Sequence, residues 1–288
     1  MLVKRSLPLT IAALVLLLGA DGVHSAEALP QGNGVPTTVI VRVVGNHGMP
    51  LGDTVGGAAV TIKDVETGAI LASGTQTGST GDLRAIMQTP RLPTEQVFST
   101  KDSASFTAEL ALAKPTVVEV IGEGPLKYPA AKRRASKTVL LYPGKPVTGD
   151  GIVLQLYGMI VQIEAPKADQ PLGIGDSVTV RATVRMMCDC IIEPFGNWDS
   201  RKMSLYGEVR SDSQVIGKFD FFHQGPKGLF LGDYTIPRKL KGTDRLTLRV
   251  VASDAEGINV GYDEHAYPLV PWEQSRDATG REIPPIGK

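Results

Sequence analysis

The chain consists of short stretches in which apolar and polar residues alternate, separated by turn residues. It has 32 glycines and 20 prolines among 288 residues. Alternation with a period of two, enriched in β-branched residues, is typical of strands that bury one face. Short strands with a turn roughly every 8–12 residues favour a β-sandwich. The sequence therefore predicts an all-β protein, and its length suits two β-sandwich domains in tandem.

The N-terminus has the pattern of a secretory signal peptide. Lys4 and Arg5 precede an apolar run from Leu9 to Gly19, and small residues surround Ser25. A basic start, a short apolar run and small residues at the cleavage site define such signals. The apolar run is too short to span a membrane comfortably, and no later stretch is long enough. We therefore expect residues 1–25 to be removed, leaving a periplasmic mature protein without a membrane span.

The charge balance excludes one class of partner. The chain has 30 Lys and Arg against 30 Asp and Glu, and removal of Lys4, Arg5 and Asp21 gives 28 − 29 = −1. A near-neutral protein without a basic stripe is unlike nucleic-acid-binding proteins. We expect no nucleic-acid partner, and instead a periplasmic protein or a small ligand.

The first predicted domain covers residues 37–157. Strands are expected at 37–44, 58–64, 70–75 and 83–87, then at 106–112, 116–121, 138–142 and 151–157, with the basic cluster Lys132-Arg-Arg134 in a loop. The first four resemble the transthyretin-like, carboxypeptidase-regulatory β-sandwich through Gly48-Met-Pro-Leu-Gly52, Ala59-Val-Thr-Ile62, Asp64, Thr67-Gly68, Leu71, Gly74-Thr75 and Gly81. The resemblance covers Thr37 to Met87. It implies a fold and no activity, because this fold hosts many functions.

The second predicted domain covers residues 158–271, with the boundary at Gly158. Strands are expected at 159–166, 177–187, 203–210, 215–222, 228–234, 246–252 and 260–270. The run from Leu246 to Asn259 resembles the final strand pair of bacterial immunoglobulin-like domains. This resemblance implies an immunoglobulin-like sandwich, followed by a polar tail at 272–288.

The segment from Met186 to Trp198 is the most unusual stretch of the chain, because it holds both cysteines and one of the two tryptophans. It continues the alternating strand 177–187. If the strand stayed regular, Cys188 and Cys190 would share its valine face, while Met187 and Asp189 would point away. Their Cα atoms would then be roughly 6.5–7 Å apart, at the limit of disulfide geometry. A bridge would need the strand to bend.

Several interpretations of this segment remain open. The cysteines could be buried core residues or form a structural disulfide. They could bind Cu(I) with Met186 or Met187 as a thioether ligand, because soft sulfur ligands select that ion. They could form an easily reduced redox bridge. Alternatively, Asp189, Phe195 and Trp198 could contact a ligand or partner. Copper is therefore a possible cofactor, and the sequence makes no cofactor certain.

No catalytic motif stands out in the sequence. It contains no serine nucleophile elbow, phosphate-binding loop or zinc-protease helix. We therefore predict a non-enzymatic exported binding or accessory protein that presents loops of two β-sandwiches. The alternatives are a periplasmic copper-handling protein and a thiol–disulfide redox protein.

Overall fold

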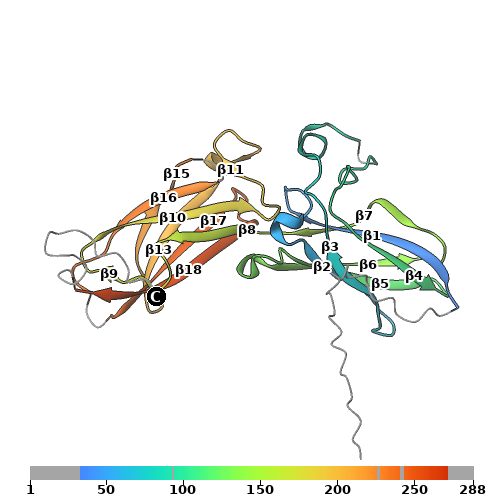
Figure 1. The fold of residues 1–288 in the computed structure, drawn as a ribbon, viewed down its shortest axis with the longest axis horizontal. Helices are drawn as coiled ribbons and strands as arrows, with labels where there is room; N and C mark the ends of the chain where they lie inside the picture. The colour runs from blue at the N-terminus through green and yellow to red at the C-terminus, as the bar shows by residue number, and fades with distance from the viewer. Residues whose placement is uncertain (1–32, 93, 226–227, 241–242, 272–288) are drawn as a thin grey trace, which may run out of the picture.

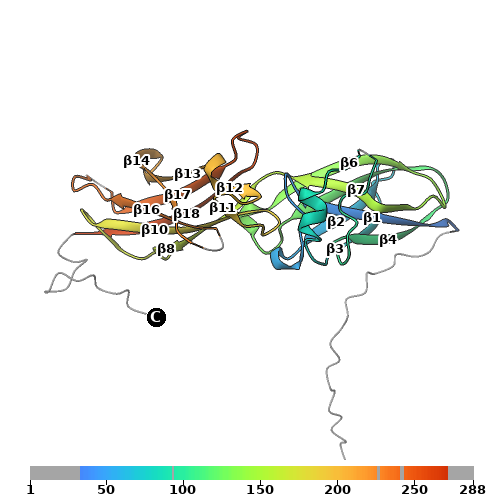
Figure 2. The same cartoon turned by 90° about the horizontal axis from the view of Figure 1, so that it is seen from above.

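The computed structural model describes residues 33–92, 94–225, 228–240 and 243–271 (Figures 1 and 2). The predicted signal peptide and polar tail lie outside these ranges. The predicted all-β class is confirmed: strands dominate, and helical structure in the described ranges is confined to four single turns. No helix in the described part of the chain is long and apolar enough to cross a membrane.

The first domain is a sandwich of two sheets. One sheet has the order β4-β1-β7, and the other has the order β3-β2-β5-β6. The strands are β1 (Val35–Gly45), β2 (Ala58–Asp64), β3 (Ile70–Gln76), β4 (Phe106–Leu112), β5 (Thr116–Gly124), β6 (Arg133–Leu141) and β7 (Val147–Leu156). Alternate residues of β1, β2 and β5 are buried between the sheets, as the period of two predicts.

Two segments of this domain differ from the prediction. Residues 84–88 form a wide helical turn, η2 (Arg84–Gln88), where a strand was predicted. The carboxylate of Asp82 accepts the amide proton of Ala85 at 2.8 Å, which caps this turn and favours it over a strand. The basic cluster was expected in a loop, but Arg133 and Arg134 begin β6. Two shorter turns are η1 (Asp53–Val55) and η3 (Pro129–Ala131).

The second domain is a sandwich with sheet orders β15-β16-β10-β8 and β14-β13-β17-β18-β9. A parallel pair of two-residue strands, β11 (Ile192–Glu193) and β12 (Trp198–Asp199), and the turn η4 (Ser200–Lys202) lie beside them. The other strands are β8 (Met159–Ala165), β9 (Leu172–Gly173), β10 (Ser177–Met186), β13 (Ser204–Ser211), β14 (Gln214–Asp220), β15 (Phe222–His223), β16 (Leu229–Thr235), β17 (Arg245–Ser253) and β18 (Val260–Val270).

Gly158 lies between the last strand of the first domain and the first strand of the second. In the described part of the chain, every strand pairs with strands on its own side of Gly158. Its amide donates to the side-chain oxygen of Asn259 at 3.1 Å, and Asn259 is 1% exposed. Asn259 also donates to Asp254 at 2.7 Å. The turn between β17 and β18 therefore holds the linker, and the domains meet end to end (Figure 1).

Candidate functional site

The segment Met186–Trp198, hereafter the joint segment, lies where the two domains meet. Strand β10 ends at Met186, earlier than predicted, because the chain turns there. The amide of Asp189 donates to the carbonyl of Met186, and the amide of Met186 donates to the carbonyl of Cys190, both at 3.0 Å. Asp189 has a left-handed φ of 66°, a conformation that Asp tolerates better than most residues.

A disulfide joins Cys188 and Cys190 across this turn. The bend brings their Cα atoms to 5.2 Å, within the usual range for a bridge. Cys188 is 1% exposed. Its sulfur lies close to Gly48 of the first domain, and a Cβ atom at position 48 would be only 3.2 Å from it. The bridge therefore lies against the first domain and fixes the turn that reaches it.

The two methionines of the joint segment enter different cores. Met186 is 2% exposed and packs in the second domain, whereas Met187 is 1% exposed and packs in the first. Met49 of the first domain does the reverse and packs in the second core. Ile86 and Met87 of η2 also pack against the second core. Each sandwich thus has core residues supplied by the other.

The predicted copper ligands are consequently not gathered in the oxidised protein. The sulfurs of Cys188 and Cys190 are bonded to each other, and Met186 and Met187 point into separate cores. In the described part of the chain no group of three or more His, Cys, Asp or Glu could hold a metal. Copper binding stays a prediction, and it concerns the reduced protein.

Arg185 connects the joint segment to both domains. Its guanidinium bonds Asp189 and the side-chain oxygen of Gln162, both at 2.5 Å. It also lies 5.4 Å from the ring centroid of Tyr128 in the first domain and donates to the Tyr128 hydroxyl at 3.4 Å. Asp189, predicted as a partner contact, is therefore engaged in the turn itself.

Trp198 is also engaged between the domains. It is 8% exposed, and its indole nitrogen donates to the backbone carbonyl of His47 at 2.7 Å. Next to it, the side chain of Gln88 donates to Asn197 at 3.2 Å. The predicted contact residue Trp198 thus faces the first domain rather than solvent.

Phe195 is the member of the joint segment that faces solvent. It is 80% exposed, the highest value among the large apolar side chains described. It lies in the turn Glu193–Gly196, which is closed by a 3.3 Å bond from the Gly196 amide to the Glu193 carbonyl. Pro194 precedes it, and its own φ is 64°. Pro in the second position and a left-handed third residue define a type II turn, where Gly or Asn is the usual third residue.

Asp199 and Arg201 hold this turn. Asp199 accepts the Phe195 amide at 3.2 Å and the Arg201 amide at 3.1 Å. Its carboxylate also pairs with the Arg201 guanidinium, whose carbon lies 3.6 Å from the Phe195 ring centroid. The hydrogen bonds from the Arg201 side chain, helped by the backbone donors, hold the pKa of Asp199 well below its usual value. The ring is therefore stacked on the Arg201 guanidinium, and the turn that carries it is held by Asp199.

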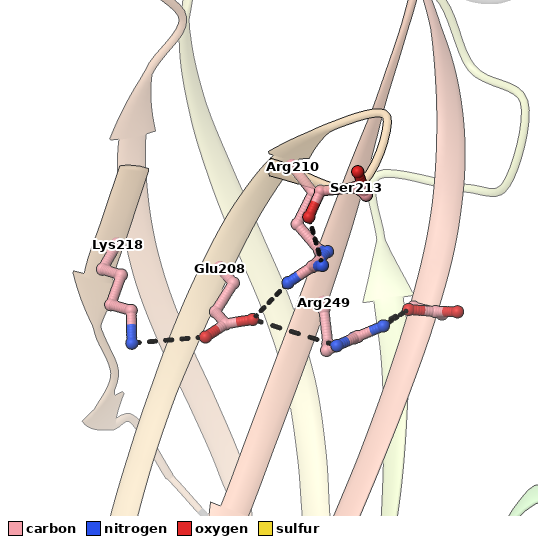
Figure 3. Close-up of polar contacts among 6 residues, drawn as sticks. Glu208, Arg210, Ser213, Lys218 and Arg249 are labelled. Carbon is pink, nitrogen blue, oxygen red and sulfur yellow. Dashed lines mark hydrogen bonds and ion pairs between the residues drawn. The ribbon is translucent and has the colours of Figure 1, made fainter. Parts of the chain in front are cut away.

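A second polar cluster lies on the outer face of the second domain (Figure 3). Glu208 on β13 pairs with Arg210 and Lys218 at 3.2 Å and with Arg249 at 4.0 Å. Arg249 also bonds Glu264 at 2.6 Å. Lys218, Glu208, Arg249 and Glu264 are direct neighbours across β14, β13, β17 and β18, and Arg210 lies two residues from Glu208 on β13. The cluster is therefore a cross-strand ladder that joins four strands.

Sequence reasoning identified Phe195 but missed its supports. No sequence motif marks the residues that hold the turn and the domain contact, because their partners are either distant in sequence or brought close only by the turn. These residues are Met49, Asn197, Asp199 and Arg201. The Pro-Phe-Gly order of residues 194–196 is the one local signal of the turn.

The comparisons with known proteins give fold neighbours only. No family model matches the chain, and no curated protein matches it. A DUF3823 family protein from Bacteroides ovatus is 12% identical over 81% of this chain and 100% of its own, with a TM-score of 0.31. The fibronectin(III)-like modules of Clostridium thermocellum CbhA are 14% identical over 76% and 81%, with a TM-score of 0.26. The ICAM-5 D1–D4 fragment is 12% identical over 86% of this chain and 54% of its own, with a TM-score of 0.28. The fold class rests on the strand pairing described above.

Proposed function

We propose that this chain is an exported, non-enzymatic binding protein, in which two docked β-sandwiches fix the Phe195 turn for contact with a partner protein. The observation that carries the proposal is Phe195 itself, a rigidly held aromatic side chain that is 80% exposed. The basic and apolar N-terminal sequence supports export to the periplasm.

Phenylalanine contributes little to the fold at this position beyond its stacking on Arg201. A left-handed backbone costs a non-glycine residue about 1–2 kcal/mol, and an exposed ring recovers little of this through burial. Asn or Gly would fit the turn better. A strained, exposed residue held by a built network is typical of a functional position.

The geometry suits insertion of the ring into an apolar pocket of a partner. Aromatic residues and arginine dominate the binding energy of protein interfaces, and here Phe195 and Arg201 are stacked. Because Asp199 fixes both, little side-chain entropy remains to be lost on binding. Asn197 and Trp198 anchor the same loop to the first domain, so domain docking positions the site.

The test compares Phe195 with Phe222, which is 68% exposed on β15 and has no left-handed backbone. A photo-crosslinking amino acid is placed at each position in the mature protein in its native host. We expect one discrete crosslinked protein from position 195 and none from position 222. Crosslinks of equal yield and pattern at both positions would contradict the proposal.

Stability measurements separate binding from folding. Phe195→Asn should unfold in urea at the same or a slightly higher concentration than the parent chain. Added as a competitor, it should not lower the yield of the crosslinked partner at position 195. A loss of more than about 1 kcal/mol on this change, the cost of a typical contact, would mean that Phe195 serves the fold.

A further inference from the structure

We infer that the outer edge of β6 is a second interaction surface, which accepts an extended acidic segment of a partner protein as an added strand. It lies in the first domain and is independent of the Phe195 turn. Strand β6 is the last strand of the sheet β3-β2-β5-β6, and in the described part of the chain it pairs with β5 alone. An edge strand presents unpaired N–H and C=O groups to another strand.

The segment that contains this edge strand has charges of one sign, and the nearest acids are Glu119 and Glu123 on the paired strand β5. Between Glu123 and Asp150 the sequence has six cations and no acid. The cations are Lys127, Lys132, Arg133, Arg134, Lys137 and Lys145. Arg134 pairs with Glu123 at 3.4 Å, whereas Lys132, Lys137 and Lys145 are exposed and form no ion pair with another described residue. In a near-neutral chain, this is a concentrated field for an acidic ligand.

Lys137 makes the edge selective. It is directly opposite Val120, which is fully buried, so it lies on the core face of the strand. A generic strand added here would bring an apolar residue beside the ammonium group, and such inward charges normally prevent edge pairing. A carboxylate opposite Lys137 removes that penalty. The same lysine disfavours a second copy of this chain, because antiparallel β6 strands would bring like charges together.

The other face of β6 carries Arg134, Ser136, Thr138 and Leu140, so it is polar along most of its length and apolar at the Leu140 end. Leu140 is directly opposite Val117 on the outward side, and the Val65 amide donates to the Val117 carbonyl. Together with Ile70 and Tyr142, these side chains are 44–64% exposed and form one end of the outer sheet face. Val117 and Leu140 are cross-strand neighbours, whereas Lys63 and Glu119 separate Ile70 from β6, so the apolar contact that the edge offers is centred on Leu140.

These two faces define the chemistry of the added strand. Side chains of a strand alternate between faces, so the segment would place apolar residues beside Leu140 and acidic residues beside Lys137. Backbone bonds along β6 would supply affinity, and the alternation would supply specificity. A segment of alternating valine and glutamate can place valine beside Leu140 and glutamate beside Lys137, because these two residues lie on opposite faces of β6.

The test titrates the ¹⁵N-labelled mature protein with an acetylated, amidated octapeptide of alternating valine and glutamate. We expect slowed amide exchange at alternate residues of β6 and at no other strand. Lys137→Glu should weaken binding roughly tenfold, since an attractive cross-strand pair becomes repulsive. Leu140→Ser should weaken it severalfold, and Lys101→Glu, at an exposed loop lysine, should leave it unchanged.

Three results would overturn the inference. The first is no protection of β6 amides at low salt and millimolar peptide. The second is equal binding by a valine–lysine octapeptide. The third is equal binding by an octaglutamate peptide without β6 protection, which would indicate a general polyanion surface. None of these results bears on Phe195, so the two proposals fail separately.

Discussion

Replacement of Met187 by alanine tests whether the joint segment couples the two domains. Met187 is 1% exposed in the core of the first domain, although it directly follows strand β10 of the second domain. Truncation of a buried methionine to alanine costs about 2–5 kcal/mol through lost burial and the cavity left behind. For domains totalling more than 200 residues this corresponds to a melting temperature lower by roughly 5–15 °C.

Met186→Ala is a matched control, because the neighbouring residue has the same side chain and is 2% exposed in its own core. Differential scanning calorimetry should show one transition for the parent chain, since each core includes residues of the other domain. We expect Met186→Ala to shift this transition as a whole, and Met187→Ala to split it in two. Identical profiles for the two variants, or an unshifted Met187→Ala profile, would refute the coupling.

Further expectations concern the other contacts of the joint and the outer sheet. Trp198→Phe removes an indole–carbonyl bond and should cost about 1–2 kcal/mol in urea unfolding. The pKa of Asp199 is lower in the folded state than its ordinary value of 3.8. Its contribution to the stability of the turn is therefore complete above pH 3.8 and is lost only as the pH falls through the lower folded-state pKa. The amide proton shifts of residues 195–201 should stay constant above pH 3.8 and change only below it. Glu208→Ala leaves three cations together and should destabilise the second domain by about 1–3 kcal/mol, which a salt titration should partly reverse. After reduction, the protein should bind about one Cu(I) in preference to Zn(II), measured by metal analysis, and a double serine variant of Cys188 and Cys190 should bind none if the copper prediction holds.

Local patterns were sufficient to predict the architecture. Alternation in β10, with Val180, Ala182 and Val184 on one face, identified a strand whose inner residues are buried from Val180 to Met186, with Val178 partly buried. Period-two burial depends on neighbouring residues in sequence, so a single chain reveals it. Prediction was wrong where a side chain overrode the pattern, as at the η2 turn, where Asp82 caps residues that read as a strand.

The arrangement of the joint could not be predicted, because it depends on contacts between distant residues. Met187 was predicted to point away from the valine face if the strand stayed regular. The strand ends at Met186, and Met187 packs in the core of the first domain, a contact that no local pattern indicates. The bend at Asp189 likewise decides whether the cysteines can bridge, and a left-handed aspartate is one of several conformations open to it. Trp198 appeared available to a partner because its acceptor, the His47 carbonyl, is 151 residues away.

The exchange of methionines between the cores has a consequence for how such a protein can be inherited. Tandem sandwich domains are often regarded as independent units that recombination can separate, and Gly158 has the position of a boundary between two such units. A first half released there would lack the side chain that Met187 inserts, and a second half would lack Met49. Neither fragment would have a complete hydrophobic core. The two halves should instead descend together, and mixing separately expressed fragments should restore in trans what the cut removed.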